Sequence, residues 1–401
     1  MGSPPENRRL AEAKATGPEP SAPAAFERVR LALAQGLFNP LDGVTLGDWL
    51  GLLARHGRRI PAHYWPRTVF TTGMAALNSG VAAWERWRHA GHLEATPIRP
   101  PVFVLGHHRS GTTHLWNVLS RAPGFAYPSI LQAVFPHSFL TFEPWVRVPA
   151  RIFTMRRRPQ DRVEIDPDGP IEEERALCTS TFASAQMVRH FPREAAHYRR
   201  YLTLRDVPEP ERLAWKHAFA LFARKLAIRH GTDATLLFKS PDHTAKLRTL
   251  LELFPDARFV HVHRDPFVVW ASTLRMEHRT RQIYAFQDWP SDADLEDYVL
   301  WRYRTMYSAF FEDLPEVPPE RFAEVSFREL EADGLGTVRR IFEQWGEPLN
   351  PQGERAIRDY LDGIRGYRKN RHPEISERTR RRIVDAWGFC FDRWGYSKEL
   401  G

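Results

Sequence analysis

The sequence predicts an α/β fold with a mostly parallel sheet, and two observations support this prediction. Residues 235–239 and 257–262 are short apolar segments with the length and composition of buried strands. Residues 244–254, which lie between them, have apolar side chains at helical spacing. Because parallel strands are joined by a crossover that is usually a helix, this order indicates a parallel sheet. Ligands are then expected at the carboxyl ends of its strands.

The chain is long enough for one large domain or two ordinary ones, with 401 residues of which 42% are hydrophobic. Residues 1–24 are rich in proline, alanine and charge and lack the apolar stretch of a signal peptide, so we expect a disordered tail. Residues 25–98 have apolar side chains at helical spacing and predict a helical region that packs on the core. Residues 99–401 are then expected to form the α/β domain.

The most apolar run of the N-terminal region covers residues 68–84. It is interrupted by Thr, Asn, Ser and Gly, and it falls short of a membrane-spanning helix. We expect a buried helix here. A helix that lies in the interface of a membrane is the alternative.

The net charge limits the kinds of ligand that the protein can bind, and the cysteine content indicates its redox compartment. A net charge of +8, from 57 basic and 49 acidic residues, suits a polyanionic small molecule, an anionic membrane surface or nucleic acid without choosing among them. The two cysteines cannot form a disulfide framework, which favours a reducing compartment and argues against a structural zinc site. We therefore expect a cytoplasmic protein, with peripheral membrane contact left open.

A polar loop bounded by glycines follows another apolar strand, residues 102–106. The loop reads HHRSG, and residues 112–119 have the composition of a helix whose first turn carries hydroxyl groups. Unpaired backbone N–H groups and the positive end of the helix dipole converge at such a helix start. The loop therefore predicts a site for a phosphate-like anion, although a simple glycine turn would give the same pattern.

The spacing of this loop is close to that of nucleotide triphosphatases, G-x-x-x-x-G-K-[ST]. Gly106 and Gly111 take the glycine positions and Thr113 the hydroxyl position, but Thr112 stands where the lysine is required. Arg109 instead supplies a fixed cation earlier in the loop. The missing lysine weakens the prediction of a kinase or nucleotide triphosphatase.

The motif RSGTT behind an apolar strand resembles the 5′-phosphosulfate loop of sulfotransferases that use 3′-phosphoadenosine 5′-phosphosulfate (PAPS). The resemblance implies a P-loop-like, three-layer α/β/α core and a reaction that needs no metal. It also implies that Ser110, Gly111, Thr112 and Thr113 bind the 5′-phosphate through backbone N–H and hydroxyl groups. His114 stands where cytosolic members commonly have a tryptophan that stacks on adenine, so an imidazole would take that place.

Two later segments resemble other parts of the donor site in the same family. HRDPFVVWAS places Arg264 just beyond a strand and Ser272 eight positions later, two turns into the next helix if Pro266 lies in its first turn. A guanidinium and a hydroxyl at these positions can converge on a 3′-phosphate, whereas a strand-end ion pair is the plainer alternative. A late basic loop closes over the donor in the family, and Arg368 and Lys369 match its place loosely. A solvated basic turn is the alternative there.

The segment FKSPDHT supplies the candidate catalytic base. His243 precedes Arg264 by twenty-one positions, and this spacing resembles that of the catalytic histidine in cytosolic sulfotransferases. The resemblance implies that His243 accepts the acceptor's proton, for which an ordinary histidine pKa near neutrality is suitable. Lys239 and Arg109 would stabilise the charge of the transferred group. A turn in which Asp242 caps a helix is the alternative.

Three consecutive glutamates provide a reserve candidate for the base. DPDGPIEEERAL places Glu172, Glu173 and Glu174 after Pro170, and acidic residues in a first helical turn would favour the helix dipole. A similar P-x-E-E-E segment occurs near the acceptor in the bacterial sulfotransferases that the chain resembles. One of these carboxylates could therefore be the base instead of the histidine.

Histidines of the glycine-bounded loop are further alternatives. His107 and His108 could act as bases because they lie in the loop itself. Together with His114 they lack the spacing of a convincing metal site, so no metal is expected.

The remaining segments supply further elements of the α/β domain. We expect a fourth strand at residues 322–325 and helices at residues 209–230, 335–345 and 377–394. Residues 125–158 are crowded with aromatic residues and prolines, which argue against one continuous helix. This segment could wall an acceptor pocket or rest on a membrane surface, and an ordinary core flank with a basic end is the alternative.

The function expected from these features is a PAPS-dependent sulfotransferase. It would transfer the sulfuryl group in line to a hydroxyl or amine acceptor and release 3′,5′-adenosine bisphosphate. The aromatic segment hints at an apolar or lipid-like small molecule as acceptor, while a sugar, steroid, phenol or peptide would also fit. No nucleic acid partner is expected. The alternatives are a kinase or nucleotide triphosphatase, and a basic membrane- or polyanion-binding protein without catalysis.

Overall fold

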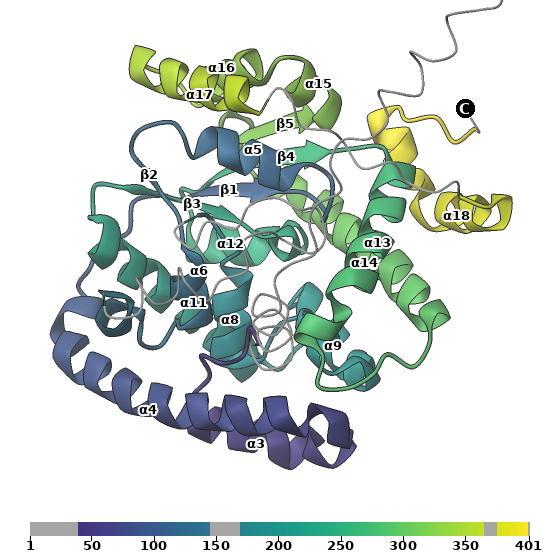
Figure 1. The fold of residues 1–401 in the computed structure, drawn as a ribbon. Helices are drawn as coiled ribbons and strands as arrows, with labels where there is room; N and C mark the ends of the chain where they lie inside the picture. Colours follow the sequence, from purple (N-terminus) through teal and green to yellow (C-terminus); the bar gives the residue numbers. More distant parts are fainter. Residues whose placement is uncertain (1–38, 145–168, 365–374, 400–401) are drawn as a thin grey trace, which may run out of the picture.

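The computed structural model describes residues 39–144, 169–364 and 375–399 of the chain. Five strands form a sheet in the order β2-β3-β1-β4-β5, and each neighbouring pair is parallel (Figure 1). The predicted parallel sheet is therefore confirmed. The strands are β1 (Val102–Leu105), β2 (Phe125–Ala126), β3 (Thr235–Lys239), β4 (Arg258–His263) and β5 (Phe322–Ser326).

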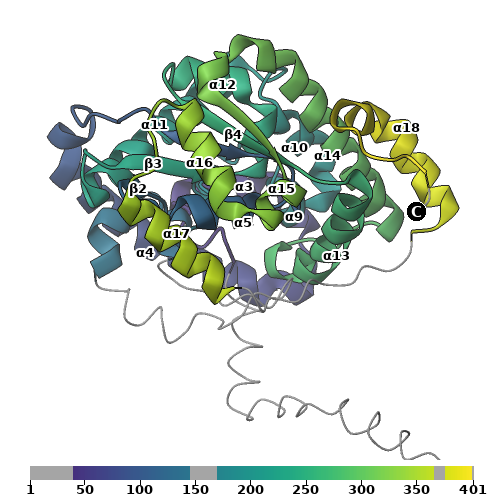
Figure 2. The same ribbon diagram turned by 90° about the horizontal axis from the view of Figure 1, so that it is seen from above.

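Helices cover both faces of the sheet, which gives the three layers expected of a P-loop-like core (Figures 1 and 2). Alternation along each strand decides which layer a side chain joins. In β1, Val102 and Val104 pack into one layer, whereas Phe103 and Leu105 pack into the other. The first layer contains α5 (Thr112–Leu119), α15 (Phe327–Ala332), α16 (Gly334–Gln344) and α17 (Pro351–Gly363). The second contains α8 (Glu174–Thr181), α11 (Glu209–His230), α12 (Leu247–Leu253), α13 (Pro266–Tyr284), α14 (Asp292–Asp313) and α18 (Glu377–Trp394).

An N-terminal helical region packs on the second layer, as predicted. Helices α3 (Leu46–His56) and α4 (Trp65–Leu93) lie side by side along the lower edge of the molecule in Figure 1. Short helices complete the described chain: α6 (Ile130–Val134), α9 (Met187–His190) and α10 (Ala195–Tyr198). The predicted tail, residues 1–24, lies outside the described residues, and the proposed domain limits remain a prediction.

The expectation of a buried helix at residues 68–84 is wrong. Helix α4 spans this segment, but the side chains of Val69, Leu77 and Trp84 are 71%, 57% and 51% exposed. The side chains that α4 buries are largely polar, because they find hydrogen-bond and ion-pair partners in the neighbouring elements. Among the helices of the described residues, none is both long enough and apolar enough to cross a membrane.

Two helix starts differ from the sequence-based expectation. Helix α8 begins at Glu174, so Glu172 and Glu173 precede its first turn, and Ile171 N–H bonds Pro128 C=O at 3.0 Å. The expected helix 244–254 is divided into a 3-10 turn, Pro241–Ala245, and α12. Asp242 does not cap a helix, because its carboxylate pairs with Arg302. At Asp242, a long-range ionic contact therefore takes the carboxylate that could have capped a helix.

Phe103 lies at the centre of the second layer and supplies a test of the fold. Its ring stacks between Phe238 and Phe259, with both centroid distances at 5.5 Å, and it is fully buried. We expect Phe103→Ala to lower the free energy of urea-induced unfolding by about 3–5 kcal/mol, because the cavity has little room to collapse. Leu213→Ala, at a half-exposed position, is the control and should change it by less than about 0.5 kcal/mol. Equal effects of the two substitutions would contradict a core centred on this ring.

Candidate active site

The register of the sheet places the glycine-bounded loop between two other strand ends. Val104 lies beside Lys239 of β3, and Leu105 lies beside His261 of β4. The loop leaves β1 at Gly106 and enters α5 at Thr112. Polar residues that follow β3 and β4 are therefore brought to the two sides of the loop, as the parallel topology requires.

The loop has an unusual backbone that its own hydrogen bonds hold in place. The φ angles of Gly106, Arg109 and Gly111 are all positive, at 134°, 70° and 108°. The N–H and hydroxyl groups of Ser110 both donate to His107 C=O, at 3.1 and 2.8 Å. A positive φ in a non-glycine residue costs on the order of 1 kcal/mol and is typical of functional loops. The loop therefore holds a backbone conformation that its own hydrogen bonds stabilise.

The first turn of α5 presents backbone donors to the loop. Gly111 is the N-cap residue and supplies no side-chain acceptor. Thr112, which is buried, and Thr113, which is half-buried, are the first two residues of α5, so hydroxyl groups lie in the same turn as the unpaired N–H groups. An arrangement of this kind binds anions through donors and helix dipole together.

Arg109, Arg264 and Ser272 come together from three different elements. Arg109 Nε donates to Ser272 Oγ at 2.9 Å, and the Arg264 guanidinium donates to Arg109 C=O at 3.3 Å. The guanidinium of Arg264 also lies 4.3 Å from the ring centroid of Phe327. Burial lowers the pKa of Arg264, yet arginine keeps its charge. This cluster would therefore favour a bound anion that offsets the cost of the buried charge.

A second cluster lies at the end of β3, where Lys239 meets the glutamates before α8. Lys239 Nζ donates to Glu172 Oε1 at 2.7 Å, and Lys239 N–H donates to Glu173 Oε2 at 3.0 Å. Lys239 Nζ also lies 5.0 Å from the centroid of the buried Trp116 ring. The glutamates expected to favour a helix dipole instead hold charged groups of the site.

His243 is completely buried between two carboxylates. Its Nδ1 lies 2.9 Å from Glu173 Oε1 and its Nε2 lies 3.4 Å from Glu174 Oε2. Neither contact has good hydrogen-bond geometry, so the attraction is mainly ionic. Lys246 Nζ donates to the other oxygen of Glu174 at 2.8 Å. Carboxylates therefore face both ring nitrogens of His243.

Within this cluster, each charged group shifts the pKa of its neighbour against the effect of burial. Burial alone would lower the pKa of His243, but Glu173 and Glu174 raise it above its usual value. Burial would raise the pKa of Glu174, but Lys246 and His243 lower it to about 2. Burial would also raise the pKa of Glu172, and Lys239 more than offsets this effect. Glu173 and Glu174, which lie on the two sides of the ring, thus favour the protonated form of His243.

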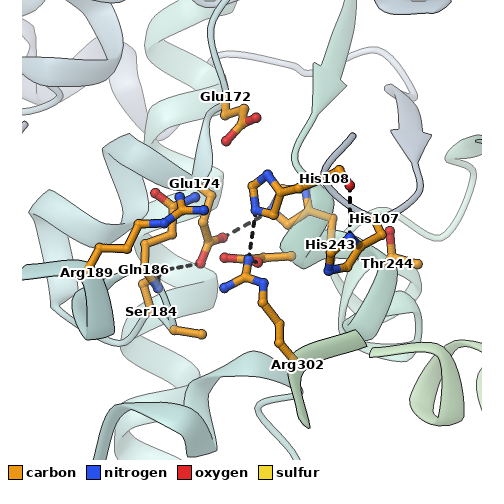
Figure 3. A network of polar contacts seen from close by, with 12 residues as sticks. His107, His108, Glu172, Glu174, Ser184, Gln186, Arg189, His243, Thr244 and Arg302 are labelled. Carbon is orange, nitrogen blue, oxygen red and sulfur yellow. Dashed lines mark hydrogen bonds and ion pairs between the residues drawn. The ribbon is translucent and has the colours of Figure 1, made fainter. Parts of the chain in front are cut away.

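Arg302 of α14 forms a buried network beneath the loop that the sequence did not reveal. It pairs with Asp242, donates to Tyr298 OH at 2.8 Å and lies 3.0 Å from His108 Nε2. Figure 3 shows Arg302 reaching into the polar network that contains Glu174 and His108. The one signal in the sequence was a charged residue in the middle of a helix whose neighbouring positions are aromatic and apolar.

The two histidines of the loop are uncharged. Burial, and secondarily Arg302, lower the pKa of His107 to about 3 and lower that of His108 well below its usual value. His107 Nδ1 lies 2.9 Å from His108 C=O. Because His108 Nε2 faces an arginine donor, this nitrogen acts as an acceptor in the network rather than as a free base.

The structure brings most of the sequence-predicted residues to the loop and its two flanks. His114 is half-buried, with its ring 6.3 Å edge-on from Phe327. Arg368 and Lys369 lie outside the described residues, as does the basic end of the aromatic segment, residues 156–158. Within the described ranges, no group of three or more His, Cys, Asp or Glu side chains is arranged to hold a metal ion.

Comparison with known proteins identifies the class of this loop and fold. Residues 100–351 match the model of the sulfotransferase family. The chain is 30% identical, over 362 residues, to proteins from Mycobacterium bovis and Mycobacterium tuberculosis named omega-hydroxy-beta-dihydromenaquinone-9 sulfotransferase Stf3. These alignments cover 89% of this chain and 91% of each relative.

Solved structures agree on the fold. Sulfotransferase STF9 from Mycobacterium avium has a TM-score of 0.68 at 19% identity, covering 94% of this chain and 98% of its own. Sulfotransferase STF1 from Mycobacterium tuberculosis H37Rv has a TM-score of 0.60 at 17% identity, covering 90% and 99%. The loop, the sheet and these matches define a sulfotransferase fold. The chain belongs to the sulfotransferase family.

Gly111 offers a test of the loop geometry. A Cβ at this position would lie 2.2 Å from Cδ2 of Phe327, whereas Gly231 has a similar φ of 100° and open space around it. Both alanine variants carry the backbone strain, but only Gly111→Ala also creates a clash. We expect Gly111→Ala to lower the free energy of unfolding by about 1–3 kcal/mol more than Gly231→Ala. Thermal or urea unfolding measures the difference, and equal losses would refute the close contact.

Proposed function

We propose that the chain transfers the sulfuryl group of PAPS to a hydroxyl, or an amine, of an apolar acceptor. The observation that carries this proposal is that Arg109 links two groups of residues that can bind anions. One is the loop that enters α5, to which Arg109 belongs, and the other is Arg264 with Ser272, both of which contact Arg109. A donor with anionic groups on both its 5′ and 3′ sides would use the two together. Membership in the sulfotransferase family supports the same donor.

The residues of the two anion-binding groups would each bind a different part of the donor. The N–H and hydroxyl groups of residues 110–113 would bind the 5′-phosphate, and Arg264 with Ser272 would bind the 3′-phosphate. His114 would lie against adenine. Arg368 and Lys369 would close over the donor from the late basic segment. A kinase-like reaction is disfavoured because Thr112 occupies the position of the lysine.

Lys239 and Arg109 would stabilise the charge that moves in the transfer. An in-line transfer of a sulfuryl group asks the protein mainly to align the two reactants and to stabilise developing negative charge. Arg109 lies in the loop itself, and Lys239 lies at the end of the neighbouring strand. Fixed cations in a partly buried site are effective because they need no reorganisation during the reaction.

The base is best assigned to Glu172, with His243 as the second candidate. His243 is fully buried, and the neighbouring carboxylates raise its pKa, which favours the protonated ring over a free base. The Glu172 side chain is 18% exposed, and its carboxylate accepts a hydrogen bond from Lys239 Nζ. When Lys239 shares its charge with the sulfuryl group, burial would raise the pKa of Glu172 toward the range of a useful base.

His243 would then act as a positioning residue. Its charge holds Glu173 and Glu174, and Glu173 in turn accepts the N–H of Lys239. The imidazolium would thereby fix the strand end from which Lys239 reaches Glu172. This assignment keeps the histidine essential to the site without a proton transfer.

The acceptor class is inferred from the mycobacterial relatives. Their name specifies a hydroxylated menaquinone derivative, which is an apolar lipid. The alignment covers most of both chains, so an apolar or lipid-like hydroxyl compound is the proposed acceptor here. Assays of labelled sulfate transfer to quinols, phenols, sterols and sugars test this proposal, and transfer to sugars alone would reject it.

The two candidates for the base make different predictions. We expect Glu172→Gln to lower kcat by about 10²–10⁴-fold with little change in thermal unfolding, because it loses a proton acceptor that is partly exposed. His243→Gln should lower the unfolding temperature markedly, because it removes the ion-pair partner of the buried Glu173 carboxylate, whereas Glu174 keeps Lys246. Glu94→Gln, an exposed position, is the control. Near-normal kcat in Glu172→Gln, with kcat abolished in a folded His243→Gln, would return the role of base to the histidine.

The 3′-phosphate assignment is tested by a cycle of two ligands and two proteins. Adenosine 3′,5′-bisphosphate should bind the wild type about 10- to 100-fold more tightly than adenosine 5′-monophosphate, as expected for a charged hydrogen-bonded pair. Arg264→Ala should remove most of this preference, and Arg378→Ala, at an exposed position, should keep it. Calorimetry measures the affinities of both ligands for the wild type and for the two variants.

The same calorimetric assay separates the alternative functions. Tighter binding of ATP than of the bisphosphate would favour a kinase or nucleotide triphosphatase. Salt-sensitive binding of single-stranded DNA, without nucleotide preference, would favour a polyanion-binding protein.

A further inference from the structure

Helix α4 exposes large apolar side chains to solvent and turns several polar side chains toward the protein. A surface helix of a soluble protein usually has the opposite arrangement. At 3.6 residues per turn, the largest exposed apolar side chains of α4 fall within an arc of about 120°. The side chains that it buries fall within an arc of about 80° on the opposite side. The exposed set is Trp65, Val69, Leu77, Trp84 and Trp87, which we call the α4 apolar face. The buried set is Arg67, Thr71, Ala75, Asn78, Ala82, Glu85 and Leu93.

Polar contacts fix the inner side of the helix against the protein. Arg67 donates to Ala285 C=O at 2.6 Å, and Asn78 donates to Gly43 C=O at 2.6 Å. Glu85 forms a buried ion pair with Lys225. Rotation of the helix to bury its apolar side would break these contacts and leave buried charges unpaired. The apolar side is therefore held outward.

The α4 apolar face is continuous. From Trp65 to Trp84, the exposed positions of the helix hold only Trp, Pro, Val, Gly, Ala and Leu. From Trp65 to Trp87 the helix extends about 33 Å. The rings of Trp84 and Trp87 lie side by side with centroids 4.9 Å apart and are 51% and 71% exposed. A row of this length differs from the scattered exposed apolar residues of ordinary surfaces.

Basic residues flank both ends of this face. Arg55, Arg58 and Arg59 are exposed before α4, and Arg86 and Arg88 are exposed near its end. Between residues 50 and 93 the exposed positions include no Asp or Glu. Tryptophan at the ends of an apolar row, with arginine beside it, is the composition that partitions into the headgroup region of an anionic bilayer.

We propose that the α4 apolar face docks this protein on the surface of an anionic lipid bilayer. The tryptophans and Leu77 would enter the boundary between headgroups and acyl chains, with the helix axis parallel to the surface. Arginines at its two ends would contact lipid phosphates. Figure 1 shows α4 on the outer edge of the molecule, with the helices of the second layer between it and the sheet. Docking would not depend on the transfer reaction, but it would suit an enzyme whose acceptor is a membrane lipid.

The test is co-flotation of the full chain with vesicles. We expect binding to vesicles of phosphatidylcholine with one quarter phosphatidylglycerol, weaker binding to pure phosphatidylcholine, and a decrease with added salt. Brominated acyl chains should quench the tryptophan fluorescence of the bound protein. Absence of binding to the anionic vesicles would overturn the proposal.

Matched variants locate the contact. Leu77→Gln and Leu213→Gln change leucines that are 57% and 52% exposed, on α4 and α11 respectively. We expect Leu77→Gln to weaken vesicle binding at least threefold and Trp84→Gln with Trp87→Gln at least tenfold, whereas Leu213→Gln should have no effect. Arg86→Gln with Arg88→Gln should weaken binding to anionic vesicles only, and the exposed pair Arg378→Gln with Arg381→Gln is its control. Equal effects of Leu77→Gln and Leu213→Gln would overturn the assignment to α4.

Two further measurements separate bilayer docking from a damaged donor site and from self-association. Binding of adenosine 3′,5′-bisphosphate should be unchanged in all these variants, so failure of docking is distinguishable from failure of the proposed donor site. Light scattering should give the same mass for the wild type and for Trp84→Gln with Trp87→Gln. A wild-type dimer that this double substitution dissociates would assign the face to a second copy of the chain instead.

Discussion

The buried ionic cluster between Glu172, Glu173 and Glu174 and the residues that follow β3 is the constraint on which the site depends. Glu172 pairs with Lys239, while His243 lies against both Glu173 and Glu174. Lys246 also pairs with Glu174, and all three partners lie at the end of β3 or in the segment after it. Buried charges are tolerated only when all are paired, so the loss of one member leaves another uncompensated. The irregular segment before α8 is therefore held in place by charge, and Lys239 is held with it.

The sheet and the main helices were predictable because their signals are local. The strand at residues 235–239 and the helices at 209–230 and 377–394 have the limits observed in the structure. Buried strands of a parallel sheet are continuous apolar runs, and long helices repeat their apolar spacing several times. The two-residue strand β2 gives no such signal, because two residues cannot show a pattern.

The candidate site was only partly predictable, because its remaining features depend on contacts between distant segments. The loop motif and the spacing of Arg264 and Ser272 were visible in the sequence, and the structure joins them through Arg109. The ionic environment of His243 was not visible, since it depends on glutamates some seventy residues away. Arg302 was not identified from the sequence because its partners, Asp242 and His108, also lie in distant segments. For α4 the sequence left a buried helix and an interfacial helix as alternatives, because apolar periodicity does not reveal which side of a helix finds partners.

The uncharged state of His107 and His108 limits the positive charge of the glycine-bounded loop. Since burial and Arg302 hold the pKa of both rings far below neutrality, neither gains a proton at physiological pH. The positive potential of the loop then comes from the Arg109 side chain and from the positive end of the α5 helix dipole. A drift of the pH around neutrality would therefore leave the charge of both rings unchanged.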